Sequence, residues 1–250
     1  MLTPMKNTIT KTTIIIGLLI SLTSCSNSKG KTIAKIDEAS GVGYCKDTKT
    51  FIIANDEGTY YEIDKKGKTI HKEKLGKYDL EGVVCEDDRL LFAVEDKGIL
   101  IVDRKTKSKK EITLNTSYNG KKVKIFNKKS GIEGIAKDGN LVYLSKQSKK
   151  EKESFIVVVK LEPYPSRIVD ILQHNIKDTA GLTIYKDDLY MVSDKEDLLI
   201  KYDIENRKII EKIKLEEGAW EGIDFDNKGN IYLADDDGRV VKFKKKELGL

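Results

Sequence analysis

The chain has 250 residues, with 46 Lys and Arg against 41 Asp and Glu, and a formal net charge of +5 at pH 7. The basic excess is slight and the two signs are interspersed, so the composition does not indicate nucleic-acid binding, and we expect none. Lysine-rich stretches such as Lys107–Lys110 are interpreted as solvated edges and turns, with attraction to anionic lipid as the alternative.

The N-terminal segment has the features of an export signal. Lys6 and Lys11 precede the apolar run Ile14–Ile20, and Leu-Thr-Ser-Cys then ends at Cys25. The run is too short to span a bilayer, which needs about 20 apolar residues, and the whole pattern is typical of a signal peptide. Because Leu-Thr-Ser-Cys resembles the bacterial lipobox, we predict a signal peptide over residues 1–24 and lipidation of Cys25.

The lipid anchor would determine where the protein is found. Residues 25–30 are expected to be a short flexible tether, and residues 31–250 the folded domain. The mature protein would then lie in the bacterial cell envelope, attached to a membrane through Cys25 and facing the periplasm or the exterior. A plain secretory signal with an incidental cysteine is the alternative.

A short motif occurs five times after this segment, each time at the start of a hydrophobic strand. A small or acidic residue precedes a glycine, and a branched aliphatic residue follows it. Successive glycines are 41, 52, 47 and 41 residues apart, which is the length of a four-stranded propeller blade. The five motifs are Ser40-Gly41-Val42, Glu81-Gly82-Val83, Glu133-Gly134-Ile135, Ala180-Gly181-Leu182 and Glu221-Gly222-Ile223.

Each unit contains apolar strands separated by turns rich in Asp, Gly, Asn and Lys. In the first unit we expect strands at Gly41–Tyr44, Thr50–Ala54, Thr59–Ile63 and Lys68–Leu75. The third unit is longer, because a polar connector at Asn115–Lys129 precedes it and Lys146–Glu153 extends a hairpin.

The fifth unit lacks a fourth strand, and the missing strand is present at the other end of the domain. Lys31–Ile36 matches the outer strand of the first unit, so it is expected to complete the last blade and close the ring. The predicted fold is therefore all-β: a five-bladed β-propeller with four antiparallel strands per blade.

Two cysteines remain in the mature domain, Cys45 and Cys85, in the innermost strands of neighbouring units. An exported location permits a disulfide between them. They fall at successive, oppositely facing positions once the glycines are aligned, so we predict two separate buried thiols.

Three of the five opening residues are glutamates: Glu81, Glu133 and Glu221. The innermost strands of a propeller start on the same face of the disc, so these residues are expected around one mouth of the central channel. Carboxylates held together repel unless they are protonated or neutralised by a cation. All of the donors are oxygens, which favours calcium, with magnesium or manganese as alternatives.

Further oxygen donors surround this predicted site. Glu38 and Asp178 lie two positions before the opening residues Ser40 and Ala180, and Asp79 lies two positions before Glu81. Because residues i and i+2 share a face in an extended chain, we expect Glu38, Asp79 and Asp178 to supply additional ligands, with Ser40 beside them. Acidic turns after the second strands, such as Asp235–Asp237, are interpreted as ordinary turn caps.

The motif series resembles the SdiA-regulated family from Lys31 to Phe243. The resemblance is carried by Glu38-Ala-Ser-Gly-Val, Asp79-Leu-Glu-Gly-Val, Ser130-Gly-Ile-Glu-Gly-Ile and Trp220-Glu-Gly-Ile, and by a following strand such as Ile231-Tyr-Leu-Ala-Asp. It implies a five-bladed propeller, distantly related to NHL-repeat propellers, with a calcium site and no established activity. Glu81, Glu133 and Glu221 are the ligands it supports, Ala180 departs from the pattern, and no catalytic residue is implied.

We therefore expect a monomeric binding or scaffolding module whose ligand, a small molecule or a protein, sits at the propeller mouth. The alternative is a calcium-dependent hydrolase of the lactonase, esterase or phosphoesterase kind. The histidines argue against a histidine base, because His71 falls in an outer strand and His174 at the start of a connector. Trp220 adjoins Glu221 and is expected to pack between blades rather than to stack on a ligand.

Overall fold

The computed structural model describes residues 30–126, 130–162 and 165–250. The predicted signal peptide over residues 1–24, and Cys25, lie outside the described residues. Within the described part, no helix has the length and apolar character needed to cross a membrane.

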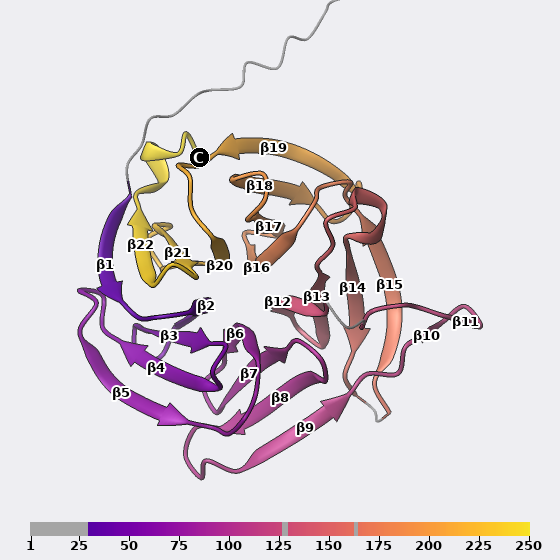
Figure 1. Ribbon diagram of the computed structural model, residues 1–250, viewed down its shortest axis with the longest axis horizontal. Coiled ribbons are helices and arrows are strands. Elements are labelled where there is room, and N and C mark those ends of the chain that lie inside the picture. Colours follow the sequence, from indigo (N-terminus) through magenta and orange to yellow (C-terminus); the bar gives the residue numbers. More distant parts are fainter. Residues whose placement is uncertain (1–29, 127–129, 163–164) are drawn as a thin grey trace, which may run out of the picture.

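Five four-stranded antiparallel sheets are arranged around a central axis, as in a propeller (Figure 1). This confirms the predicted five-bladed fold. Blade one contains β2 (Ala39–Cys45), β3 (Thr50–Asn55), β4 (Thr59–Ile63) and β5 (Thr69–Lys74). Blade two contains β6 (Leu80–Cys85), β7 (Arg89–Val94), β8 (Gly98–Asp103) and β9 (Lys109–Thr113). Blade three contains β12 (Ile132–Asp138), β13 (Leu141–Lys146), β14 (Phe155–Lys160) and β15 (Arg167–Gln173).

Blade four contains β16 (Thr179–Tyr185), β17 (Asp188–Ser193), β18 (Leu198–Asp203) and β19 (Lys208–Lys214). Blade five contains β20 (Trp220–Phe225), β21 (Ile231–Asp235), β22 (Arg239–Phe243) and the N-terminal β1 (Lys31–Lys35). The connector before blade three is not wholly polar. It forms a hairpin of β10 (Ser117–Tyr118) and β11 (Lys121–Lys122), and Ile125 is buried in the core between blades two and three.

Burial decreases from the axis to the rim, which explains the composition of each strand. All residues of β2 and β3 are buried, because these strands have a neighbouring blade on both faces. The outer strand β5 has five of its six residues exposed and one partly buried. The apolar residues form five clusters, and each cluster joins two adjacent blades. The packing between blades is therefore the hydrophobic core.

The inner strands approach one another too closely for side chains at the repeated glycines. A Cβ atom placed on Gly82 would lie 2.8 Å from the backbone nitrogen of Ile135 in the next blade. A Cβ atom on Gly222 would lie 2.8 Å from the backbone nitrogen of Val42. Only glycine allows this approach, so the repeated glycine is a requirement of the channel geometry.

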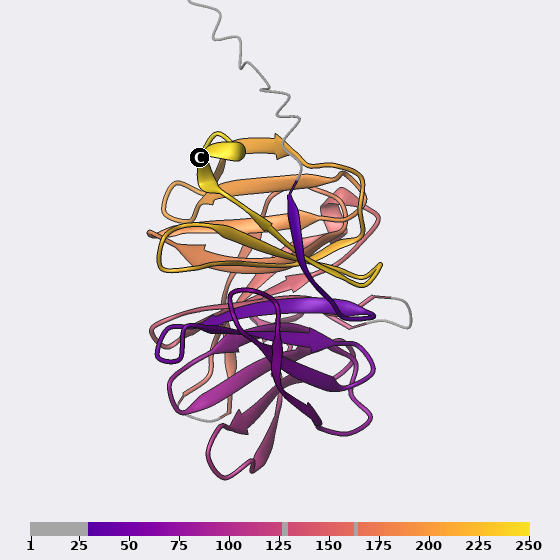
Figure 2. The ribbon, with the colours of Figure 1, turned by 90° about the vertical axis from the view of Figure 1, so that its left-hand side faces the viewer.

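The ring closes through the N-terminal strand, as the sequence predicts. β1 pairs antiparallel with β22 along the edge of the disc, with Lys31 opposite Lys242 and Lys35 opposite Arg239 (Figure 2). The backbone N–H of Ile36 continues the pairing by donating to the carbonyl of Gly238 at 3.2 Å.

A buried carboxylate joins the inner strands across the same closure. Asp224 on β20 accepts hydrogen bonds from the backbone N–H of Tyr44 in blade one, at 2.6 Å, and from the Thr183 hydroxyl in blade four, at 2.7 Å. One side chain in blade five therefore holds both of its neighbours near the axis.

The prediction of two separate thiols is wrong, because Cys45 and Cys85 form a disulfide with a Cα–Cα distance of 5.1 Å. The blades are related by rotation, so the face of β2 that looks toward blade two meets the opposite face of β6. Side chains on opposite faces of equivalent strands are therefore the ones that meet. Gly43 and Val83, which lie next to each other in the two inner strands, are also 40 residues apart in sequence, as the two cysteines are. The repeated glycines Gly41 and Gly82 are 41 residues apart, so residues that meet are shifted by one position relative to the repeat.

Shortening Ile36 should weaken the ring closure. Its side chain is 5% exposed and packs in the cluster that joins blades five and one. Because burial and cavity effects add, Ile36→Ala should lower the free energy of unfolding by about 2–5 kcal/mol in urea titrations. Ile70→Ala, on the outer strand β5 at 53% exposure, is the matched control and should cost less than about 0.5 kcal/mol. Equal losses in the two variants would contradict the closure argument.

Removing the disulfide should destabilise the protein through its unfolded state. The two cysteines are 40 residues apart in sequence. For a loop of this length, the loss of chain entropy in the unfolded state stabilises the folded protein by about 4 kcal/mol at 25 °C. The Cys45→Ala/Cys85→Ala double variant, and the parent in reductant, should both lose stability of this order in urea. No loss in either experiment would show that the bond does not form.

Candidate metal centre

Each predicted glutamate is the second residue of an inner strand, and the three lie around one mouth of the channel. Glu81 is on β6, Glu133 on β12 and Glu221 on β20. Glu81 and Glu133 are only 7% and 6% exposed, and Glu221 is partly buried. The inner strands surround the axis in Figure 1, so each glutamate shares this mouth with the other two. Their role as metal ligands stays a prediction.

Four more acids reach the mouth from turns that the sequence analysis interpreted as caps. Each directly follows the end of a second strand, because strand two runs antiparallel to strand one and ends beside its first residue. Blade three has Gln147 at the equivalent position. The four turn acids are Asp56, Glu95, Asp194 and Asp236. Their shared position in the repeat was the signal that could have identified them.

The blades that lack an opening glutamate carry acids at the other repeated positions. Blade one has Ser40 at the opening position and supplies Glu38 and Asp56 instead. The Ser40 hydroxyl donates to the carbonyl of Leu80 at 2.5 Å, so it joins blades one and two. Blade four has Ala180 at this position and supplies Asp178 and Asp194. Acids therefore surround the mouth even where the repeated motif is incomplete.

Burial, together with the crowding of these acids, raises their pKa values. Burial, followed by the charges of Glu133 and Glu221, holds the pKa of Glu81 well above its usual value of 4.5. Burial and the nearby Glu95 raise the pKa of Glu133 to about 8. Burial and the nearby Asp236 raise the pKa of Glu221 to about 9. Without a cation, the folded protein therefore retains protons on these groups near neutral pH.

Several of these carboxyl groups contact one another directly. Asp79 is hydrogen-bonded to Glu81 and also to Glu95. Asp56 is hydrogen-bonded to Glu38, and burial together with that contact raises the pKa of Asp56 to about 7. Two carboxyl groups can form a hydrogen bond only if one of them holds a proton. A bound cation could replace that proton.

Buried oxygen atoms without partners also face this region. Among the described residues, Asp178 Oδ1, Asp56 Oδ1 and Asn55 Oδ1 are buried and accept no hydrogen bond. Asp178 as a whole is 4% exposed. Leaving a buried acceptor unpaired costs free energy. A ligand that binds these oxygen atoms, such as a cation, would remove that cost.

Glu38 and Asp178 share an unusual backbone conformation. Both have positive φ angles, 53° and 51°, in the left-handed region that disfavours residues other than glycine. They occupy equivalent positions in blades one and four. Strain of this kind costs about 1–3 kcal/mol per residue and is concentrated at functional sites. The same local geometry therefore presents an acid in the two blades that lack the glutamate.

The ring of acids is wider than a compact ligand cluster. Among the described residues, one group of His, Cys, Asp or Glu side chains has all of its ligand atoms within 4.8 Å of one another. It consists of Cys45, Asp47 and Cys85, and its two sulfurs form the disulfide. The three glutamates do not meet that spacing, as expected for carboxyl groups that repel. The donor set consists of oxygens and includes unpaired ones, so it fits a hard cation of high coordination number.

Neither histidine is placed as a base at this mouth. His71 lies on the outer strand β5, with Nε2 3.3 Å from Glu73. His174 is buried, and burial lowers its pKa to about 4. Its Nδ1 accepts a hydrogen bond from the backbone N–H of Ile176 at 3.1 Å. His174 is therefore a neutral core residue.

Two other side chains near the mouth have structural contacts. Trp220 is fully buried, and its indole N–H donates to the carbonyl of Glu216 at 2.9 Å, in agreement with a packing role. Lys146 is 3% exposed and donates to the carbonyl of Gln147 at 2.8 Å. Burial lowers the pKa of Lys146. Blade three therefore has a buried lysine directly before Gln147, at the position that precedes the turn acid in the other blades.

Comparisons with known proteins agree with the propeller architecture. A sequence model of the SdiA-regulated family matches residues 25–244. No curated protein matches the chain. Among solved structures, the crystal structure of Myxococcus xanthus glutaminyl cyclase superposes with a TM-score of 0.62 at 13% sequence identity. The match covers 86% of this chain and 93% of the cyclase. At this identity the likeness concerns the fold alone.

The raised pKa values predict that the metal-free protein loses stability as the pH rises. Glu133 and Glu221 bind protons more tightly when folded than when unfolded. Their contribution is therefore full below about pH 4.5 and is lost as the pH rises through about 8 and 9. In chelator, the free energy of unfolding should fall between pH 6.5 and pH 9. The slope should be up to about 1.4 kcal/mol per pH unit for each group.

A matched variant tests the source of this slope. Glu133→Gln/Glu221→Gln should reduce this slope, because the amides do not titrate and only Glu81 remains of the three glutamates. Starting at pH 6.5 avoids His174, whose lowered pKa gives the opposite dependence at more acid pH. A slope that is flat or rising in the parent would contradict the crowding of acids described above.

Proposed function

The chain belongs to the SdiA-regulated family, and we propose that it is a calcium-binding β-propeller, lipid-anchored through Cys25, that binds a ligand at the acidic mouth. The observation that carries this proposal is the presence of acids at three repeated positions around one axis, together with buried oxygens that have no partner. A solvated acidic surface would not require either feature.

The donor set supports calcium over other metals. Calcium takes six to eight oxygen ligands in flexible geometry, whereas magnesium demands a smaller octahedral site. Glu81, Glu133 and Glu221 are the principal ligands in this proposal. Asp79, Glu38 and Asp178 complete the coordination directly or through water. The wide ring suits a large cation, because side chains and water can both contribute.

Cation binding would couple the blades to one another. Bound calcium supplies positive charge at the point where the carboxylates repel, so the acids would release protons when it binds. Glu81, Glu133 and Glu221 come from three different blades, so their common ligand would tie the inner strands of blades two, three and five together. Asp79, which contacts both Glu81 and Glu95, would hold these two side chains in place.

The same site presents a rigid surface for a partner. Its acids lie on inner strands and on short turns, which are held by the propeller framework. We therefore propose a binding or scaffolding role in the cell envelope, with a small molecule or a protein at the mouth. Neither histidine faces this mouth as a base, so hydrolysis has less support. Turnover of lactones, aryl esters or phosphoesters with calcium would favour the hydrolase instead.

Calcium should raise the melting temperature through the three glutamates. At a calcium concentration of 100 times the dissociation constant, binding adds about 2.7 kcal/mol of stability. For a domain of this size that corresponds to about 5–10 °C, measured by calorimetry against chelator. Glu81→Gln/Glu133→Gln/Glu221→Gln should abolish this shift while raising the metal-free melting temperature, because the repulsion is removed.

A control variant separates a local site from a general charge effect. Glu111→Gln/Glu162→Gln/Glu205→Gln removes the same charge from exposed positions and should retain the calcium shift. A calcium shift that survives in the mouth variant, or disappears equally in both, would overturn the assignment. Magnesium at the same concentration should give a smaller shift.

A further inference from the structure

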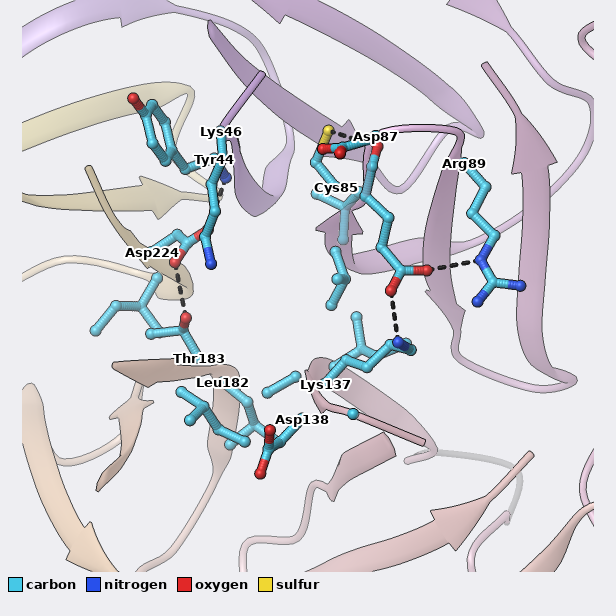
Figure 3. Close-up of a pocket in the computed structure, with 18 of the residues that line it drawn as sticks. Tyr44, Lys46, Cys85, Asp87, Arg89, Lys137, Asp138, Leu182, Thr183 and Asp224 are labelled. Carbon is cyan, nitrogen blue, oxygen red and sulfur yellow. Dashed lines mark hydrogen bonds and ion pairs between the residues drawn. The ribbon is translucent and has the colours of Figure 1, made fainter. Parts of the chain in front are cut away.

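The opposite mouth of the channel contains a separate cavity of about 580 Å³ (Figure 3). It is lined by the last residues of the inner strands and by the turns that follow them, whereas the acidic mouth lies at their first residues. Its size falls within the usual range of small-molecule pockets, about 300–1,000 Å³. The function proposed above does not use it.

The deep part of the cavity is aliphatic. Val83, Ile135, Leu182 and Ile223 line it from blades two to five, one from the same repeated position of each blade. Each of these side chains is at most 4% exposed, because it packs between blades. The base of the cavity is therefore rigid and apolar.

Several polar groups around the cavity already have protein partners. Asp224 accepts from Tyr44 and Thr183, as described above. Glu86 accepts from Lys137 at 2.5 Å and from Arg89 at 2.6 Å, so one carboxylate pairs with both cations (Figure 3). These charges are paired within the wall and are not the ones available to a ligand.

Four charged groups at the cavity remain without a side-chain partner. Within the described residues, the side chains of Lys46, Asp87, Asp88 and Asp138 form no hydrogen bond or ion pair, and all four line the cavity. Lys46 comes from blade one and lies beside Asp224, whereas Asp138 lies across the cavity on blade three (Figure 3). Asp87 follows the inner strand of blade two. Positive and negative groups therefore face the cavity from different sides.

We propose that this cavity binds a zwitterionic small molecule with an aliphatic body, such as a short peptide or an amino acid. Lys46 pairs with the ligand carboxylate, while Asp138, across the cavity, pairs with its ammonium group. The aliphatic side chain packs on the base formed by Val83, Ile135, Leu182 and Ile223. A neutral ligand would leave these charges unused, and a ligand of one sign would face repulsion from one wall.

The disulfide makes the site rigid before a ligand arrives. Cys85 lines the cavity and is bonded to Cys45 on the neighbouring inner strand. This bond fixes the spacing of β2 and β6, from which Lys46 and Asp87 follow. A site that is already ordered loses less conformational entropy on binding. The proposal is independent of the calcium site, because the two lie at opposite mouths.

The test compares a zwitterionic peptide with analogues that lack one charge. Leu-Gly should bind to the full-length mature protein in calorimetry and in ligand-observed NMR. N-acetyl-Leu-Gly lacks the ammonium group and Leu-Gly amide lacks the carboxylate, so each should bind at least about tenfold more weakly, which is about 1.4 kcal/mol. Chelator should not change these results.

Charge-reversal variants assign the contacts. Lys46→Glu should abolish the preference for Leu-Gly over its amide, and Asp138→Lys should abolish the preference over the N-acetyl form. Both residues are exposed, so circular dichroism and melting temperature should match the parent. Lys49→Glu changes the same charge in the same turn without lining the cavity, and should bind as the parent does.

Three outcomes would overturn the proposal. The first is no detectable binding of Leu-Gly at 10 mM, on the order of a hundredfold above a weak site of ~0.1 mM. The second is an unchanged preference for Leu-Gly in both charge-reversal variants. The third is tighter binding of a neutral sugar such as maltose, which would indicate a polyol site. The proposal is supported if Lys46→Glu or Asp138→Lys loses its expected preference for Leu-Gly while Lys49→Glu retains both preferences.

Discussion

The pairing of β1 with β22 is the interaction on which the rest of the molecule depends. A propeller blade buries its two faces only against neighbouring blades, so an open ring would leave two blade faces in water. The N-terminal strand completes blade five by backbone hydrogen bonds, and Asp224 joins the inner strands of blades four, five and one. The closed ring then forces the five inner strands together, which requires glycine at their closest approach.

That convergence gives the two mouths opposite electrostatic properties. At one mouth the repeated positions bring carboxyl groups together until burial and repulsion raise their pKa values. At the other mouth Glu86 pairs with Lys137 and Arg89, and isolated charges remain around an apolar base. The first arrangement is unfavourable without a cation. The fold tolerates it because the core between blades supplies the stability that the acids remove.

Sequence reasoning succeeded where the repeat itself carries the information. The glycine spacing predicted five blades, and the incomplete fifth unit predicted the closure by Lys31–Ile36. The position of Glu81, Glu133 and Glu221 followed from the same repeat. The disulfide did not, because it depends on how two strands from different blades face each other. The turn acids were interpreted as caps, because acidic residues have a local role in any turn, and the closed ring shows how near they lie to the glutamates.

The position of β1 also limits how the protein can be held at a surface. If Cys25 carries the proposed lipid, five residues lie between the anchor and Lys31, and an extended chain over these six steps reaches about 20 Å. β1 lies on the rim of the disc (Figure 2), so the bilayer would be attached to the edge of blade five. Both mouths would then open sideways, parallel to the membrane, and ligands could enter either one without passing between the protein and the lipid.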